Sequence, residues 1–390
     1  MTRLCLPTRG LGAVLVLVLW NGEARFLPGG EATQTDGVRK AVDARGDAYA
    51  KQLEGYLRHW LVEAYPERAA QAWNRDYTSP EALVQSVAPN RARWQRVLNP
   101  PPLVKTGELA RRPCESLKDL SAEWISLPLG PLTAEAVFVV PSVATVQKPV
   151  PLVIAQHGIG SFPERTFGLA DEGGAYHGYA RELVKAGFAV LAPMNLLGVE
   201  RRNRVERLCR LADTSLPGIE LARLQRLLDE VILDPRIDRE RIGMWGVSLG
   251  GLATMFWMPL EPRIKAGVVC AWFNHRRNKM AVPDPRYSCF LETKEEHAFF
   301  RGWLTEFTDA DVVSLICPRP LLIQTGKDDK IAHWPQVVEE FEAAREHYKK
   351  LGLAERMEMD LHDGGHEARV ESGMRFLARW LMEPSLSRVQ

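Results

Sequence analysis

Residues 241–258, RIGMWGVSLGGLATMFWM, join an apolar strand-like run to a helix-like run, with Gly246-Val-Ser-Leu-Gly250 at the junction. A G-x-S-x-G pentapeptide between a strand and a helix is typical of a nucleophilic serine. Such a turn is tight enough to strain its central residue, so the neighbours must be small and the hydroxyl projects toward substrate. Gly246, Gly250 and Gly251 are these small neighbours. We therefore predict that Ser248 is a nucleophile.

A serine hydroxyl reacts only with help from a histidine base, an acid that orients this base, and donors for the developing oxyanion. The acid candidates are Asp328 and Asp329, which follow an apolar run at 320–325 in a polar turn. The base candidate is His366, which lies between an alternating run at 357–361 and a helical pattern. The chain order serine, acid, histidine is the order expected for a strand-turn-helix nucleophile.

The oxyanion donors are expected in two backbone segments. One donor is the N–H group that follows the serine, and the other comes from a loop after an earlier strand. A strand-like run at 150–156 leads into His157-Gly-Ile-Gly160, which suits the second role. We therefore predict that the N–H groups of Ile159 and Leu249 hold the oxyanion. We also expect His157 to orient the loop that carries Ile159.

Two of these patterns partly match cofactor or metal sites. Gly158-x-Gly160 follows a strand-like run, as in a dinucleotide fingerprint, but Pro163 occupies the third glycine position, and the sequence has no G-x-x-x-x-G-K-[ST] phosphate loop. His362 and His366 are four residues apart, but Gly364 and Gly365 disfavour a shared helix face, and no glutamate-based zinc motif accompanies them. We expect no cofactor and no metal.

From about Ser121 to Pro384 the chain resembles the α/β-hydrolases, especially their dienelactone-hydrolase-like and acetyl-xylan-esterase-like members. The resemblance implies a mostly parallel central sheet flanked by helices, and it favours Asp329 as the acid, which usually stands three residues after a glycine. Dienelactone hydrolases proper use a cysteine nucleophile, so Ser248 points to ordinary ester hydrolysis. The shared motifs are His157-Gly-Ile-Gly160, Gly246-Val-Ser-Leu-Gly-Gly251, Cys317-Pro-Arg-Pro-Leu-Leu-Ile323 with Gly326-x-x-Asp329, and Gly364-Gly-His366.

Strand-like and helix-like runs alternate after residue 150, which indicates an α/β fold with a doubly wound parallel sheet. In such sheets ligands bind beyond the carboxyl ends of the strands, where Ser248, Ile159, Asp329 and His366 all fall. Two earlier runs, 122–127 and 134–140, predict an antiparallel hairpin. The expected strands are 152–156, 188–192, 241–247, 264–272, 321–325 and 356–361, and the expected helices are 175–186, 219–232, 249–258, 337–350 and 368–382.

We expect three segments: a signal peptide at 1–24, a helical N-terminal extension and linker at 25–120, and a catalytic domain at 121–390. The extension is rich in helix formers and carries three tryptophans as apolar anchors, Trp60, Trp73 and Trp94. Consecutive prolines then break the helical pattern at 99–102.

An insertion at 274–311 interrupts the sheet pattern, and we expect it to form a wall of the pocket. Its basic cluster, His275-Arg-Arg-Asn-Lys279, either meets an acidic group of the substrate or forms salt bridges with Glu292, Glu295 and Glu296.

The N-terminus has the pattern of a signal peptide. Arg3 and Arg9 precede ten apolar or small residues at 11–20, and Gly22-Glu-Ala24 offers small residues for cleavage. The run is too short to span a bilayer comfortably. We predict a cleaved signal, export to the periplasm or the extracellular space, and no stable membrane span afterwards. The alternatives are an uncleaved anchor and a buried N-terminal strand.

Composition permits this interpretation without selecting it. The 390 residues carry a formal net charge of +1 and are 46% hydrophobic, which is enough for a substantial core and gives no sign of nucleic-acid binding. The densest basic stretch, residues 200–210, is interleaved with glutamates, and we predict a solvated surface segment there.

The chain has six cysteines, one of which, Cys5, lies in the predicted signal. Cys270 and Cys317 sit beside apolar runs and are expected to be buried thiols. One disulfide remains open among the other three, Cys114, Cys209 and Cys289, and sequence alone cannot pair them.

The sequence thus predicts an exported serine hydrolase that cleaves carboxylic esters through an acyl-enzyme, with a small-molecule or polysaccharide ester as substrate. An acetyl esterase acting on polysaccharide fits the resemblance. One alternative is a serine peptidase of the prolyl-oligopeptidase type, although the extension is too short for the large propeller domain of such enzymes. The other is a non-catalytic binding protein on the same scaffold.

Overall fold

The computed structural model describes residues 32–382, and it divides into two compact units, one ending at Gly55 and one beginning at Tyr56. The N-terminal unit consists of helix α1 (Ala32–Arg58) up to this boundary, and its side chains from residue 35 to 55 are all exposed. The predicted signal peptide at 1–24 lies outside the described residues.

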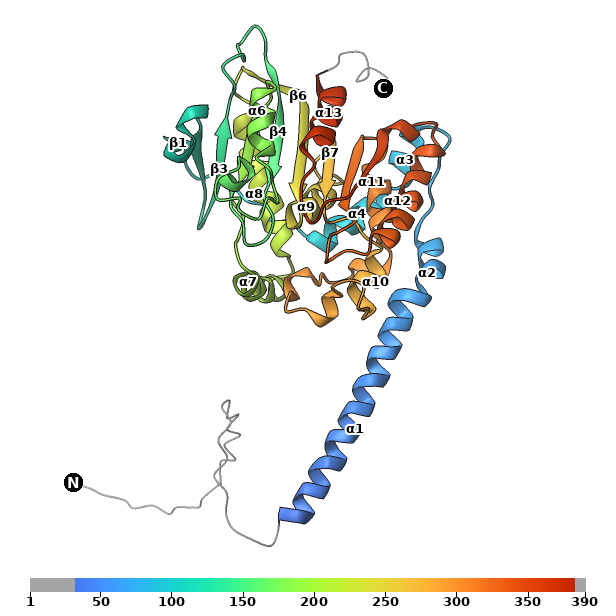
Figure 1. Ribbon diagram of the computed structural model, residues 1–390. Coiled ribbons are helices and arrows are strands. Elements are labelled where there is room, and N and C mark those ends of the chain that lie inside the picture. Colours follow the sequence, from blue (N-terminus) through green and yellow to red (C-terminus); the bar gives the residue numbers. More distant parts are fainter. Residues whose placement is uncertain (1–31, 383–390) are drawn as a thin grey trace, which may run out of the picture. The chain divides into compact units, whose positions relative to one another are not determined.

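The second unit is built on one nine-stranded sheet (Figure 1). Its strand order is β1-β2-β3-β5-β4-β6-β7-β8-β9, so that β4 and β6 are neighbours at the centre. The strands from β4 to β9 pair in parallel, whereas β1, β2 and β3 form antiparallel pairs at one edge. The strands are β1 (Ala110–Pro113), β2 (Glu123–Leu129), β3 (Leu132–Val139), β4 (Val150–Gln156), β5 (Ala189–Pro193), β6 (Ile237–Val247), β7 (Ile264–Cys270), β8 (Leu321–Gly326) and β9 (Met357–His362).

Helices cover both faces of this sheet. Residues of α6 and α13 pack on one face, and residues of α4, α8, α9, α11 and α12 pack on the other. The parallel strands run toward the lower edge of the sheet in Figure 1, where α7 and α10 lie. The helices are α2 (Tyr65–Ala72), α3 (Pro80–Ser86), α4 (Ala88–Leu98), α5 (Pro163–Thr166), α6 (Tyr179–Lys185), α7 (Val199–Leu211), α8 (Leu216–Val231), α9 (Leu249–Trp257), α10 (Arg276–Ala281), α11 (Asp309–Ile316), α12 (Trp334–Lys349) and α13 (Val370–Leu381).

Strand β4 shows why the sequence selects this arrangement. All seven of its residues are buried, which is the continuous apolar pattern of a parallel strand covered on both faces. Leu152 and Ile154 point into the core beneath α8 and α9, while Val153 and Ala155 point into the core beneath α6 and α13. Because successive side chains of a strand face opposite ways, one short segment joins two helical layers.

The predicted α/β architecture is therefore confirmed, including the antiparallel hairpin of β2 and β3. Two predictions were incomplete or wrong. The edge strand β1, which pairs with β2, was missed because its pattern Ala-Arg-Arg-Pro is exposed at every position. The stretch at 200–210 lies in helix α7. Arg201, Arg204, Arg207 and Arg210 are exposed there, as a solvated segment requires, but the opposite face is buried, and Arg202 and Glu206 are both 1% exposed.

Arg202 is a charged side chain that is buried together with its partner. Its guanidinium forms two hydrogen bonds with the carboxylate of Glu220, of 2.7 and 3.2 Å, and a third with the carbonyl oxygen of Leu196. A buried charge is tolerated when it is paired and hydrogen-bonded in this way. Charge spacing along the sequence gave no hint of this partner, which stands 18 residues away on another helix.

All five cysteines of the described residues, Cys114, Cys209, Cys270, Cys289 and Cys317, are buried free thiols. The prediction for Cys270 and Cys317 is confirmed, and the disulfide left open among the other three does not form.

Residues 65–98 are fastened to the sheet unit by buried polar and aromatic contacts. Trp94 packs edge-on against Phe256 and donates its indole N–H to the Phe256 carbonyl oxygen. Trp73 is also buried and donates to the Glu306 carbonyl oxygen at 2.8 Å. Trp60, the third expected anchor, is 42% exposed, so only two of the three tryptophans act as predicted.

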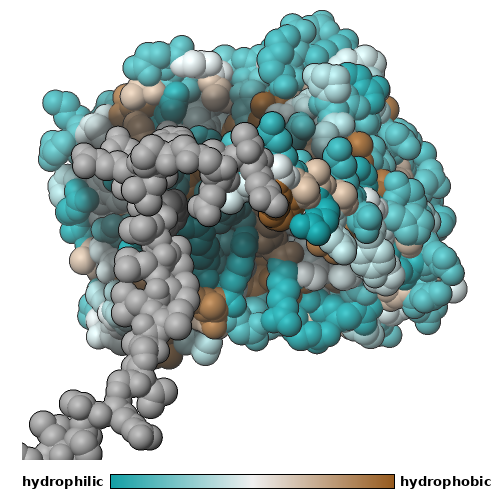
Figure 2. Space-filling view, turned by 90° about the horizontal axis from the view of Figure 1, so that it is seen from below, coloured by the Kyte–Doolittle hydropathy of each residue, from teal (hydrophilic) through white to brown (hydrophobic). Residues whose placement is uncertain are grey.

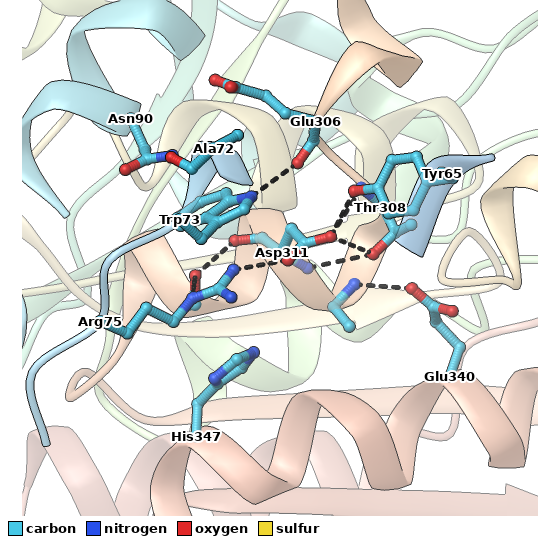
Figure 3. Close-up of polar contacts among 12 residues, drawn as sticks. Tyr65, Ala72, Trp73, Arg75, Asn90, Glu306, Thr308, Asp311, Glu340 and His347 are labelled. Atoms are coloured by element: carbon cyan, nitrogen blue, oxygen red, sulfur yellow. Dashed lines mark hydrogen bonds and ion pairs between the residues drawn. The ribbon is translucent and has the colours of Figure 1, made fainter. Parts of the chain in front are cut away.

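A polar network around Asp311 joins α2 and the segment after it to α11 (Figure 3). The Asp311 carboxylate accepts hydrogen bonds from the Tyr65 hydroxyl, the Thr308 hydroxyl and the Arg75 guanidinium. Thr308 is also the N-cap of α11, and Asp311 completes its capping box. The charge of the carboxylate is therefore balanced by donors from two separate segments.

Glu340 at the edge of this network predicts a pH dependence of stability. Burial raises its pKa from 4.5 to about 8, with the nearby Asp309 charge adding to the effect, although the Ala310 N–H donates to Glu340 Oε1 at 2.8 Å. When folding raises the pKa of a carboxyl, the group contributes stability that is fully present below the unfolded pKa and is lost as pH rises through the folded pKa. For Glu340 this loss of stability is therefore expected between pH 4.5 and about pH 8.

We expect Glu340→Gln to flatten the pH dependence of the unfolding free energy across this window. The glutamine keeps the acceptor for Ala310 and removes the ionisation, so the variant should exceed the wild type in stability near pH 8 and match it near pH 4.5. Urea denaturation at several pH values measures this. Parallel stability curves for the two proteins would contradict the assignment.

Candidate active site

The turn at Ser248 has the geometry that the G-x-S-x-G pattern predicts. Ser248 links β6 to α9 with φ of 60° and ψ of −119°, a backbone conformation that residues other than glycine rarely adopt. A Cβ atom on Gly246 would lie 1.9 Å from the Gly250 carbonyl oxygen, and one on Gly250 would lie 2.1 Å from the Gln156 carbonyl oxygen. Neither position has room for a side chain, so the glycines are required for the strained serine turn.

The structure brings the predicted acid and base together. Asp329 Oδ2 is 2.7 Å from Nδ1 of His366, although the two residues are 37 positions apart in sequence. Asp329 lies in the loop after β8, and His366 lies in the loop after β9. Asp328, the other acid candidate, is exposed, and its backbone N–H donates to the Gly364 carbonyl oxygen at 3.1 Å. The contact with the imidazole is therefore made by Asp329.

The surroundings of Asp329 keep it ionised. Burial by itself raises the pKa of this carboxyl, but the hydrogen bond and the charge of His366, the Ile331 N–H and the charge of Lys279 together hold the pKa below its ordinary value. An ionised acid that accepts from Nδ1–H leaves Nε2 of the ring as the basic nitrogen. That nitrogen is the one that a serine hydroxyl would use.

Ser248, Asp329 and His366 all line one cavity of about 260 Å³, together with Ile159 and Leu249. Leu249 is the first residue of α9, so its N–H has no partner within the helix. Ile159 follows β4 in the neighbouring loop. The structure thus places all five predicted site residues around one space, at the carboxyl ends of the parallel strands.

His157 holds the loop of Ile159 in place. Its ring is 3% exposed, and burial lowers its pKa to about 4, so the ring is neutral near pH 7. Nε2 accepts the Asn195 N–H at 3.1 Å, and Nδ1 therefore carries the proton and donates to the Gly158 carbonyl oxygen at 2.9 Å. The loops after β4 and β5 are joined by this ring, which agrees with the expected orienting role.

The insertion at 274–311 supplies much of the cavity wall. Its lining side chains are polar and apolar, and the polar ones include two cations, one carboxylate and a neutral imidazole. On the face that Figure 2 shows from below, hydrophilic residues predominate and hydrophobic residues appear among them in recessed parts. The lining residues of the insertion are Asn274, Arg276, Lys279, Phe290, Glu295, His297 and Ala298.

The basic cluster of the insertion pairs differently from the prediction. Arg276 forms a fully buried salt bridge with Asp309 at 2.8 Å, not with Glu292, Glu295 or Glu296. The Lys279 ammonium donates to the carbonyl oxygens of Ser288 and Ile331. Arg276 and Lys279 therefore stabilise the wall of the cavity, and Lys279 also ties this wall to the loop of Asp329.

His297 is a cavity residue that the sequence did not single out. Its Nδ1 is 3.0 Å from Asn203 Oδ1 on α7, and burial lowers its pKa to about 3. A neutral ring that donates from Nδ1 leaves Nε2 as an acceptor. The helix α7 was not predicted, so nothing in the pattern suggested that His297 would have a fixed partner.

Among the described residues no group of three or more histidine, cysteine or acidic side chains is arranged to hold a metal ion. His362, which stood four residues before His366, ends β9, and its Nδ1 accepts the Gly364 N–H at 3.1 Å. Within residues 32–382 no helix is both long enough and apolar enough to cross a bilayer.

No protein-family model matches the chain. A curated relative is YtaP of Bacillus subtilis (strain 168), which carries a provisional hydrolase name. It is 26% identical over 264 residues, which are 64% of this chain and 84% of YtaP.

Solved structures with a similar fold include proteins named as acetyl xylan esterases and glucuronoyl esterases. A protein of Bacteroides fragilis NCTC 9343, provisionally described as an acetyl xylan esterase, has a TM-score of 0.60 and 19% identity, and the match covers 79% of this chain and 81% of that one. A glucuronoyl esterase from Solibacter usitatus has a TM-score of 0.57 and 13% identity, with 78% and 94% covered. One from Teredinibacter turnerae T7901 has a TM-score of 0.56 and 16% identity, with 80% and 90% covered.

At these identities the solved structures establish the architecture alone. The nine-stranded sheet, its flanking helices and these neighbours show that the chain has the α/β-hydrolase fold, as its resemblance to acetyl-xylan-esterase-like sequences implied.

Proposed function

We propose that the protein is a serine hydrolase that cleaves carboxylic esters through an acyl-enzyme. The observation that carries this proposal is the 2.7 Å contact between Asp329 and His366 in the cavity lined by Ser248. A buried ionised acid on Nδ1, an imidazole and a strained serine are the parts that acyl transfer requires. The YtaP name supports hydrolysis as the reaction class.

In the proposed mechanism Ser248 Oγ attacks the acyl carbon while its proton moves to Nε2 of His366. The N–H groups of Ile159 and Leu249 stabilise the charge that develops on the carbonyl oxygen. His366 then protonates the departing alcohol, and the acyl group remains on Ser248. Water repeats the sequence with His366 as base, which releases the acid and restores the hydroxyl. Asp329 stabilises the imidazolium in both halves.

The cavity favours a small ester with a hydroxylated alcohol part. Trp272 and Phe290 offer apolar surface, whereas Glu295, Lys279 and the neutral His297 offer acceptors and donors to the same cavity. Sugars present apolar faces and hydroxyl edges, so such a mixed wall suits them better than a long alkyl chain would. The names of the structural neighbours, acetyl xylan esterase and glucuronoyl esterase, support a carbohydrate ester as substrate.

A panel of esters tests this function. Acetylated xylosides, a methyl glucuronate ester and 4-nitrophenyl esters of increasing acyl length should show turnover, with short acyl groups and sugar alcohols preferred. Cleavage of a proline-containing peptide with no turnover of any ester would favour the prolyl-oligopeptidase-like alternative. Binding of a sugar ester without turnover would favour a non-catalytic binding protein.

We also propose that the protein is exported after cleavage of residues 1–24. The support is the arrangement of Arg3 and Arg9 before the apolar run and the small residues at 22–24. Expression of the full chain in a secreting bacterial host should yield protein outside the cytoplasm that begins near Glu23 to Arg25. Intact mass and fractionation measure this. A full-length protein confined to the cytoplasm would contradict it.

A further inference from the structure

Tyr176 places a buried hydroxyl beside the predicted nucleophile. The side chain lines the active-site cavity, and the residue is 4% exposed. Its hydroxyl accepts a hydrogen bond from the Gly158 N–H at 2.8 Å. A Cβ atom on Gly158 would lie 3.2 Å from the Tyr176 hydroxyl oxygen and 3.1 Å from Cβ of Ser248. The phenol and the serine are thus neighbours around one glycine of the Ile159 loop.

The loop that carries Tyr176 is held rigidly. The carboxylate of Asp171 accepts hydrogen bonds from three consecutive backbone N–H groups, those of Ala175, Tyr176 and His177, at 2.9 to 3.2 Å. Such a multiply bonded carboxylate fixes the backbone on which the phenol stands. The position of the phenol is therefore set in advance, which is the condition for electrostatic catalysis.

The same loop is also tied to the segment that follows His366. The Ala368 N–H donates to the Ala175 carbonyl oxygen at 2.9 Å, and His177 Nε2 is 2.7 Å from Glu367 Oε2. The loop of Tyr176 therefore contacts both the Ile159 loop and the segment that follows His366.

The hydrogen bond with Gly158 uses the tyrosine oxygen as acceptor and leaves its own O–H proton to be donated. Burial raises the pKa of this phenol. The Ser161 hydroxyl, the Gly158 amide and the Arg165 charge lower the pKa, but their combined effect is smaller. The phenol therefore stays protonated near pH 7. Since it accepts from the loop that presents Ile159, its O–H can be aimed into the cavity beside Ser248.

We propose that the Tyr176 hydroxyl is a third oxyanion donor, acting beside the N–H groups of Ile159 and Leu249. The inference rests on the proposed function. As Ser248 Oγ bonds to the acyl carbon, the carbonyl π pair moves to its oxygen, and Tyr176 donates a hydrogen bond to this oxygen without releasing the proton. When the alcohol departs with the proton of His366, the pair returns to the carbonyl bond and Tyr176 is unchanged.

The test compares Tyr176→Phe with Tyr179→Phe. Removal of one oxyanion donor costs about 10²- to 10³-fold in kcat, so Tyr176→Phe should lose kcat on this scale with KM nearly unchanged. Tyr179 is a fully buried tyrosine of α6 whose hydroxyl donates to the Trp245 carbonyl oxygen at 3.0 Å, and it is not among the residues that line the cavity. Its variant also loses a buried hydrogen bond but should keep kcat near the wild-type value.

A thionoester substrate separates donation to the oxyanion from a role in holding the Gly158 loop. Sulfur is a poor hydrogen-bond acceptor, so the wild type should hydrolyse an ester much faster than its thionoester. In Tyr176→Phe this preference should shrink, because one of the donors that sense the oxygen is gone. An unchanged oxygen-to-sulfur preference would overturn the proposal even if kcat falls.

Ser161 provides a second check, because its buried hydroxyl interacts with the phenol and lowers the pKa of Tyr176. Ser161→Ala should retain the wild-type rate, and a loss equal to that of Tyr176→Phe would contradict donation to the substrate. Failure of the proposed function would look different: the wild type would hydrolyse no ester, or Ser248→Ala would remain active. An active wild type, an inactive Ser248→Ala and a fully active Tyr176→Phe would refute only the role of Tyr176.

Discussion

Ser248→Ala is expected to lower ester hydrolysis by about 10⁴-fold or more in kcat while leaving the fold intact. The substitution removes the oxygen that we propose forms the acyl-enzyme and leaves the rest of the cavity unchanged. Alanine has the same backbone preferences as serine at φ of 60°, so the strain of the turn is neither added to nor relieved. Initial rates with a short-chain aryl ester, together with thermal unfolding of both proteins, measure the effect.

The expected loss is confined to turnover. Binding of a non-hydrolysable ester analogue should survive in Ser248→Ala, since the cavity walls come from other residues. A variant that unfolds at the wild-type temperature and still hydrolyses the ester at the wild-type rate would show that another residue is the nucleophile.

Asp329→Asn is expected to reduce kcat by about 10⁴-fold, a loss similar to that known for a triad aspartate. The amide has nearly the shape of the carboxylate, but it neither stabilises an imidazolium nor enforces the tautomer with the proton on Nδ1. His366 would then present the wrong nitrogen to the Ser248 hydroxyl in much of the population. Steady-state kinetics with the same aryl ester, at a pH near 7, measure this loss.

Asp328→Asn is the matched control. Asp328 is the adjacent residue with the same charge, but it is exposed, and its backbone N–H donates to the Gly364 carbonyl oxygen. We expect this variant to remain within about threefold of the wild-type rate, as for a surface substitution away from the chemistry. If Asp328→Asn is inactive and Asp329→Asn is active, the assignment of the acid is wrong.

Much of this fold was predictable because its signals are local. The run from Arg241 to Met258 contains a parallel strand, a glycine turn and a buried helix, each with its own apolar pattern. The same holds for β4, whose continuous apolar residues indicate a strand covered on both faces. Once the order of strands and helices is known, the carboxyl ends of the parallel strands define where Ser248, Asp329 and His366 must come together.

The parts that escaped prediction depend on partners far away in sequence. Arg202 of α7 was not expected to be buried, because its pairing with Glu220 cannot be seen before the chain folds. The Asp311 network likewise joins residues more than 200 positions apart, and its tyrosine and arginine have no distinctive local pattern.

Tyr176 and His297 belong to the same class. Tyr176 lies in a loop and His297 in a single 3-10 turn, and each is held at the cavity by a hydrogen bond to another element, Tyr176 to Gly158 and His297 to Asn203. A tyrosine or histidine in a loop is usually structural, so residue type alone could not single them out. Only the position of their partners brings them to the cavity.

We propose above all that His366 and Asp329 make the Ser248 hydroxyl reactive. The most direct measurement is covalent labelling by a fluorophosphonate, followed by mass spectrometry of the digested protein and by the rate of labelling in each variant. We predict one adduct, on the peptide that contains Ser248, with labelling that is abolished in Ser248→Ala, strongly slowed in Asp329→Asn and unchanged in Asp328→Asn. A wild-type protein that acquires no adduct on Ser248, or acquires it equally fast without Asp329, would contradict the account.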